Sequence, residues 1–282
     1  MQGKAFPSFG ECIYCGSKSD LTDEHIIPFS LGATATIEQG SCKSCASITS
    51  YLDGYLARNT FYHMRVHAKV PTRREYPIDL PIKFAIDNDS YETFVPIDDH
   101  PFFVALPMWG PPGLLTGESP STEFSNATAS MWWYVPPNIK ETLKLRDDQE
   151  AMLFPTVATV NVQTFARAIA KIAYCHAILG FGLNGFRPLA LPDVILGKHP
   201  YASYYVGSKE PTTPPSPRKR MHQIWQLDML DKPYAVVAVR LFSNCGTPTV
   251  GKPVYHVVVG IKAAPKTILR RPALVLTRVL PL

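Results

Sequence analysis

The sequence predicts an α+β protein in two parts, a small cysteine-rich domain over residues 1–78 and a larger mixed α+β domain over residues 79–282. Three observations support this prediction. Four of the six cysteines stand in two CxxC pairs near the N-terminus. The chain has 282 residues, 46% of them hydrophobic, whereas one core commonly uses about 100–200 residues. Segments typical of strands and of helices both occur after residue 78.

The two CxxC pairs are Cys12/Cys15 and Cys42/Cys45. Two intervening residues let both thiolates of a pair face one ion, and a second pair completes a tetrahedral zinc site. The alternatives are ordinary buried thiols or two disulfides, but disulfide frameworks are typical of small secreted chains. No export signal follows Met1, so we expect a cytoplasmic protein. Four thiolates leave no open position, so this zinc would be structural.

The segment Leu21 to Pro28 lies between the two pairs and carries an acid next to a histidine. Its apolar and β-branched residues are typical of a short strand, which Pro28 ends because proline lacks the ladder donor. Neighbours on a strand point to opposite faces, so Glu24 and His25 could flank one phosphate only at a bent or splayed strand end. The alternative is that Glu24 is a solvated turn acid and His25 a structural histidine.

Together, the CxxC pairs, the Asp23 to Pro28 core, Gly32 and the helix after Cys45 resemble the HNH endonucleases over residues 8–75. The resemblance implies a ββα-metal fold and hydrolysis of DNA phosphodiesters. It implies that His25 is the general base and that Glu24, with Asp23 as a weaker candidate, holds a catalytic Mg²⁺ or Mn²⁺. An imidazole suits the role because it is largely neutral at pH 7, and a hard cation stabilises phosphate charge.

One position departs from this pattern, because Ala46 stands where many HNH proteins have a histidine or asparagine ligand. The helix that begins there offers Asp53, seven residues on and on nearly the same face, as a replacement ligand. The alternative is that Asp53 is a surface acid. The orienting amide of the motif is not evident either, and Gln39 is the nearest candidate. The site therefore has either a variant ligand set or little activity.

A basic stretch follows, with no acidic residue from position 58 through 74. An apolar stripe from Leu52 to Val70 predicts a helix that Pro71 breaks. Its cations could form a track for DNA phosphates, although a solvated helix face is the alternative. The residues of this predicted track are Arg58, Arg65, Lys69, Arg73 and Arg74.

The domain boundary is expected between Pro71 and Pro81, where prolines stiffen the chain. A helix should run from Thr164, a possible cap, to Gly180, which can end it; its polar interruptions exclude a membrane span. A short helical turn is expected at 193–197. Loops are expected at 107–120 and 210–217. Strands are expected over residues 82–86, 93–97, 102–106, 131–135, 222–227, 234–242 and 254–261.

The formal charge of +5 permits contact with nucleic acid without requiring it. We expect a divalent-metal-dependent DNA endonuclease whose second domain selects the target or regulates cleavage, as in effectors of bacterial defence, by analogy alone. A homodimer and a small-molecule or protein activator are further expectations. The alternative is a non-enzymatic, zinc-containing nucleic-acid-binding protein with a degenerate HNH site. A zinc-stabilised protein-interaction domain is a third class.

Overall fold

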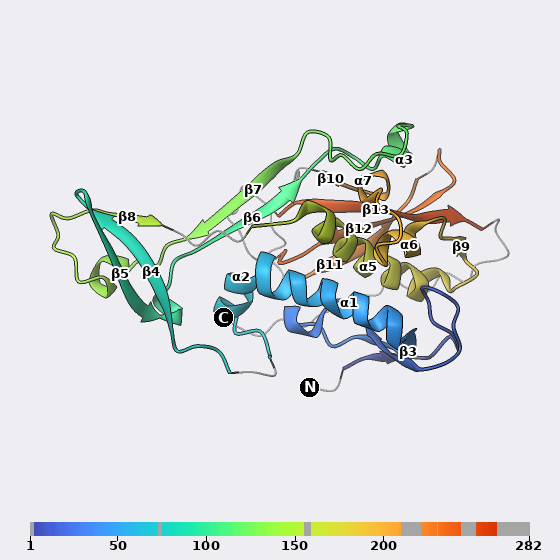
Figure 1. The fold of residues 1–282 in the computed structure, drawn as a ribbon, viewed down its shortest axis with the longest axis horizontal. Coiled ribbons are helices and arrows are strands. Elements are labelled where there is room, and N and C mark those ends of the chain that lie inside the picture. Colours follow the sequence, from blue (N-terminus) through green and yellow to red (C-terminus); the bar gives the residue numbers. More distant parts are fainter. Residues whose placement is uncertain are drawn as a thin grey trace.

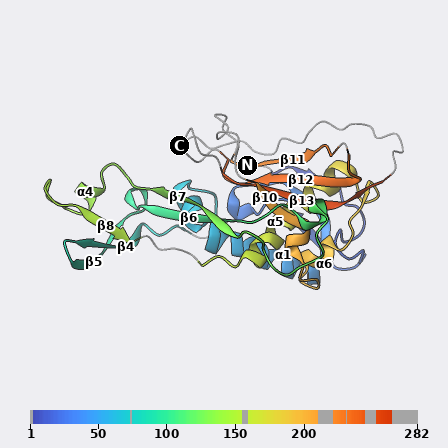
Figure 2. The same ribbon diagram turned by 90° about the horizontal axis from the view of Figure 1, so that it is seen from above.

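The computed structural model describes residues 3–72, 75–154, 159–209, 221–229, 231–243 and 252–263. The molecule is elongated (Figure 1): a small N-terminal layer and a central sheet form its body, and a separate sheet lies at the far end of a two-stranded ribbon. Figure 2 shows the ribbon and this end sheet extending from the body along the long axis. Both helices and strands are well represented, which confirms the predicted α+β class.

The N-terminal layer contains the predicted ββα unit. Strand β2 (Leu21–His25) pairs antiparallel with β3 (Thr36–Cys42), β1 (Ala5–Phe6) adds to β3 in parallel, and α1 (Lys43–Tyr55) follows at once. The β2 to β3 register shifts between Thr22 and Glu24, so the strand is irregular beside Asp23. A 3₁₀ turn at Phe29–Leu31 then reverses the chain.

The predicted basic helix is shorter than expected and is not continuous with α1. A π-helical turn over Leu56–Thr60 separates α1 from α2 (Tyr62–His67). A π turn shifts the helical register. Side chains spaced for one face of a regular helix therefore do not all share one face here.

The body is built on an antiparallel sheet with the strand order β10-β13-β12-β11, to which β9 adds along part of β13. Helix α5 (Val162–Phe181) packs against β12 and β13 on one side and against α1 on the other. The sheet strands are β9 (Phe186–Arg187), β10 (Val206–Lys209), β11 (Gln223–Leu227), β12 (Tyr234–Arg240) and β13 (Val254–Lys262). Two short helices, α6 (Leu191–Ile195) and α7 (Ala202–Tyr205), connect α5 to β10.

Helix α5 begins two residues before the predicted limit at Thr164 and ends one residue after the predicted limit at Gly180. Asn161 is the true N-cap, because its side-chain oxygen accepts a hydrogen bond from the Thr164 backbone N–H at 2.8 Å. Gly182 follows the helix with a positive φ of 76°, which glycine adopts without steric cost. Almost every residue from Thr164 to Ile178 is buried, because both sides of the helix are covered.

The end sheet joins β4 (Asp79–Ile86), β5 (Asp89–Pro96) and β8 (Ala151–Phe154), and its small core lies under α4 (Ile139–Thr142). The ribbon consists of β6 (Phe102–Met108) and β7 (Thr128–Tyr134), with the short helix α3 (Gly113–Thr116) between them. All seven strands predicted after residue 78 are present, with shifted ends. The sequence prediction missed β8, β9 and β10, while the expected loop 210–217 lies outside the described residues.

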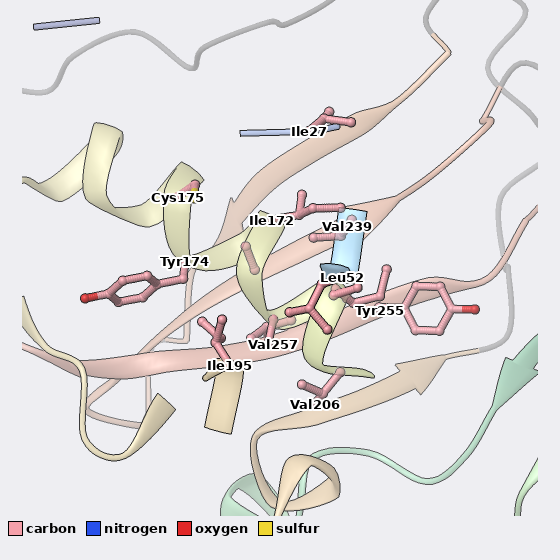
Figure 3. Close-up of a cluster of buried hydrophobic side chains, with 14 of the residues drawn as sticks. Ile27, Leu52, Ile172, Tyr174, Cys175, Ile195, Val206, Val239, Tyr255 and Val257 are labelled. Atoms are coloured by element: carbon pink, nitrogen blue, oxygen red, sulfur yellow. The ribbon is translucent and has the colours of Figure 1, made fainter. Parts of the chain in front are cut away.

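One hydrophobic core joins the N-terminal layer to the central sheet. Figure 3 shows Ile27 and Leu52 gathered with Ile172 of α5 and with Val239 and Val257 of the sheet. The core therefore runs across the expected boundary at residue 78, and the division into two domains stays a prediction. None of the described helices is long and apolar enough to cross a membrane.

Candidate functional site

The four cysteines of the CxxC pairs meet at one point of the N-terminal layer. Cys12 and Cys15 lie in a tight turn that Gly16 closes by donating to the Cys12 carbonyl at 2.9 Å. Cys42 is the last residue of β3, and Cys45 lies in the first turn of α1. All four sulfur atoms lie within 4.8 Å of one another. The ββα unit thus brings both pairs together, as predicted.

This donor set fits a structural zinc ion. Four thiolates about 2.3 Å from zinc stand about 3.8 Å from each other in a tetrahedron, and Cys15 Sγ lies 3.6 Å from Cys42 Sγ. The described cysteines are free, so the two-disulfide alternative is not what the structure contains. A hydrogen bond with the Ser44 hydroxyl lowers the pKa of Cys42 to about 6, whereas burial raises the pKa of Cys45. A bound cation would favour the thiolate form of all four.

Glu24 points inward, away from solvent, and is only 3% exposed. One carboxylate oxygen accepts a hydrogen bond from the Thr49 hydroxyl of α1 at 3.1 Å. The other lies 3.0 Å from the Nζ atom of Lys171, which α5 supplies from the C-terminal part of the chain. Glu24 is therefore neither a solvated turn acid nor an open metal ligand, but one half of a buried ion pair.

Asp53 shares the same lysine. Its two carboxylate oxygens lie 3.0 and 3.1 Å from Lys171 Nζ, and the backbone carbonyl of His25 accepts a further hydrogen bond from this ammonium group. Burial raises the pKa of Asp53 to about 6, although Lys171 acts in the opposite direction. Burial would lower the pKa of Lys171, but Asp53 and Glu24 outweigh it and raise that pKa above its usual value.

The expected catalytic cation does not fit this arrangement. Glu24 and Asp53 do converge, as a shared ligand role would require, but they converge on a fully buried ammonium group. Asp23 is exposed, and its carboxylate accepts from the Gln39 backbone N–H at 3.0 Å. Within the described ranges, the four cysteines are the one group of three or more metal-ligating side chains.

His25 ends β2 and is half-buried, whereas its neighbour Glu24 is buried. This difference is expected for neighbours that alternate along a strand. The His25 ring lies 6.3 Å from the ring of Phe29, centre to centre. The backbone of His25 is fixed by Lys171, while its side chain is the part of the predicted pair that solvent reaches.

The predicted basic track is not a single exposed row. Arg58 is exposed on the π turn, but Arg65 is only 7% exposed and donates through Nε to the Ser30 carbonyl at 2.9 Å. Lys69 is exposed and forms an ion pair with Asp98 at 3.0 Å. Arg73 and Arg74 lie outside the described residues. Binding of DNA by these residues stays a prediction.

The feature that sequence reasoning missed is Lys171. Its sequence signal is a lysine in the middle of an otherwise apolar helix, one of the polar interruptions that argue against a membrane span. The described chain also has a cavity of about 250 Å³, but it lies between the end sheet and the ribbon. Aromatic and aliphatic side chains with His100 line it, and none of the predicted site residues does.

Residues 12–61 match the family model for HNH endonucleases. The matched segment contains both CxxC pairs, β2, β3, α1 and the π turn, so the predicted resemblance is confirmed over this part of the chain. Comparisons with curated proteins and with solved structures give no match. The family match implies a nuclease-type segment, for which DNA is the expected substrate.

Proposed function

We propose, from the match to HNH endonucleases over residues 12–61, that this segment is a zinc-stabilised nuclease module that hydrolyses DNA phosphodiester bonds. The observation that carries the proposal is that the matched segment folds as a ββα unit with its four cysteines together. Bound zinc would cross-link the turn after β1 to the start of α1 and would stabilise the fold without taking part in the reaction.

His25 would take the proton from the water that attacks the phosphorus atom. It is the half-exposed member of the Glu24–His25 pair, and a neutral imidazole nitrogen is a suitable acceptor near pH 7. The hydrogen bond from Lys171 to the His25 carbonyl anchors the strand end that carries this ring. No step is assigned to Mg²⁺ or Mn²⁺, since the carboxylates predicted to hold the ion are engaged by Lys171.

A second function is favoured by two observations on the same site. Ala46 offers no ligand, and both candidate carboxylates are tied to a lysine. These features are consistent with a module that binds nucleic acid and has lost cleavage. In either case, three points stay predictions: selection of the target DNA by residues 79–282, regulation by the same residues, and a role in bacterial defence.

Cleavage of supercoiled plasmid separates the two functions. The zinc-loaded full chain is incubated with plasmid in Mg²⁺, in Mn²⁺ and with neither ion, and plasmid binding is measured in parallel. Nicking that His25→Ala abolishes and that the control His199→Ala retains would support the nuclease. Salt-sensitive binding without nicking in any condition would support the second function. Neither binding nor nicking would refute both.

A further inference from the structure

The buried lysine of α5 has the surroundings of a bound cation. Three groups from the HNH-type segment accept from Lys171 Nζ: the Glu24 carboxylate, the Asp53 carboxylate and the His25 carbonyl. The Thr49 hydroxyl holds the second oxygen of Glu24 at 3.1 Å. Oxygen ligands from β2 and α1 thus surround one positive charge on several sides.

The distances are those of an ammonium group. N–H···O hydrogen bonds in proteins are about 2.7–3.2 Å long, whereas Mg²⁺ binds oxygen at about 2.0–2.1 Å and Ca²⁺ at about 2.3–2.6 Å. The carboxylate contacts of Lys171 measure 3.0 to 3.1 Å. A divalent ion in the same space would have to displace a lysine that has no exposed side-chain surface.

The positive charge of Lys171 also offsets the negative charges of the Glu24 and Asp53 carboxylates. Two carboxylates that are 4% and 19% exposed face each other across Lys171, and without a cation they would repel in a poorly solvated place. Burial of a charged group is tolerated only when it is paired. The lysine therefore meets the same electrostatic need that a metal ion would meet.

We propose that Lys171 is the resident cation of the HNH-type segment, replacing a divalent ion between Glu24 and Asp53. The absence of a metal ligand at Ala46 and the presence of a lysine on α5 then have one explanation, which is that an ammonium group takes the place of the metal ion. The site is complete only when α5 packs against α1. The inference rests on residues 12–61 being HNH-type, as in the proposed function, but does not require that they cleave DNA.

Manganese titration followed by electron paramagnetic resonance tests the proposal, because the signal of free Mn²⁺ falls when the ion binds protein. The samples are the zinc-loaded full chain as wild type, Lys171→Met, Glu24→Gln and the Lys171→Met/Glu24→Gln pair. We expect no Glu24-dependent site in the wild type. Lys171→Met should gain one site per chain, with an affinity at least tenfold above that of the double variant.

Two results would overturn the proposal. One is a Mn²⁺ site in the wild type that Glu24→Gln weakens at least tenfold, because Lys171 would then yield to the ion. The other is a folded Lys171→Met protein without any gain in Mn²⁺ binding. If Lys171→Met does not fold, the wild type and Glu24→Gln decide, and equal weak binding by both supports the proposal. Cleavage is not measured, so failure here is distinct from loss of nuclease activity.

Discussion

His222 should make the protein less stable in mild acid, and a substitution to asparagine should remove this effect. The side chain is 1% exposed and links two parts of the core. Its Nε2 atom lies 2.7 Å from the Leu31 carbonyl, and its Nδ1 atom accepts from the Phe242 backbone N–H at 3.2 Å. This network assigns the neutral tautomer with the proton on Nε2. A second proton on Nδ1 would point at the Phe242 N–H, so the hydrogen bond between these groups would be lost.

The size of the effect follows from the lowered pKa. Burial lowers the pKa of His222 to about 4, against about 6.5 in an unfolded chain. Because the folded pKa is the lower one, the unfolded state binds more protons between pH 6.5 and 4, and stability is lost as the pH falls through this window. The full loss is about 3 kcal/mol, and about 2 kcal/mol of it is expected by pH 5.

Urea denaturation of zinc-loaded wild type and His222→Asn at pH 7 and pH 5 measures this loss. Asparagine can still accept from Phe242 but has no group that titrates, and it should cost about 1–3 kcal/mol at pH 7 through the lost bond to Leu31. Acid effects on the cysteines and other histidines are common to both proteins and cancel. The stability gap should shrink by about 2 kcal/mol at pH 5; a gap that does not change with pH would refute the reasoning.

Four other substitutions test the site. Cys42→Ser should lower the melting temperature and remove its sensitivity to a zinc chelator; an unchanged chelator response would contradict the zinc assignment. Lys171→Met should cost about 3–5 kcal/mol in urea denaturation, because it leaves two buried carboxylates unpaired, and converting both carboxylates to amides should recover most of this. Arg58→Ala should weaken salt-sensitive DNA binding at unchanged stability, whereas Arg65→Ala should mainly lower stability. If instead Arg65→Ala weakened DNA binding and left stability unchanged, Arg65 would belong to the predicted basic track after all.

The ββα unit and the cysteine cluster could be predicted from sequence because their information is local. The CxxC spacing fixes which sulfurs can share an ion, and strand-like residues with Pro28 set the limits of β2 to within three residues. Most strands of the second part were found for the same reason. Their alternation or apolar runs are visible within a few residues.

The environment of Glu24 could not be predicted, because it depends on a residue 147 positions away in the chain. A lysine within an apolar helix indicates a buried partner, but it does not indicate which carboxylate. Arg65 shows a related limit. Its spacing suited a basic face, but the π turn before α2 changed the register and turned its guanidinium toward Ser30.

Both sides of helix α5 are covered by other parts of the chain. This limits whether residues 1–78 can fold when they are separated from the rest of the protein. Truncation after residue 78 would remove the lysine from Glu24 and Asp53. It would also remove Ile172, Val239 and Val257 from the core that contains Leu52. Residues 1–78 are therefore not an independent module that could be fused to an unrelated domain. A shorter protein with residues 1–78 would need α5, or an equivalent helix that carries a lysine, to keep this ion-pair network.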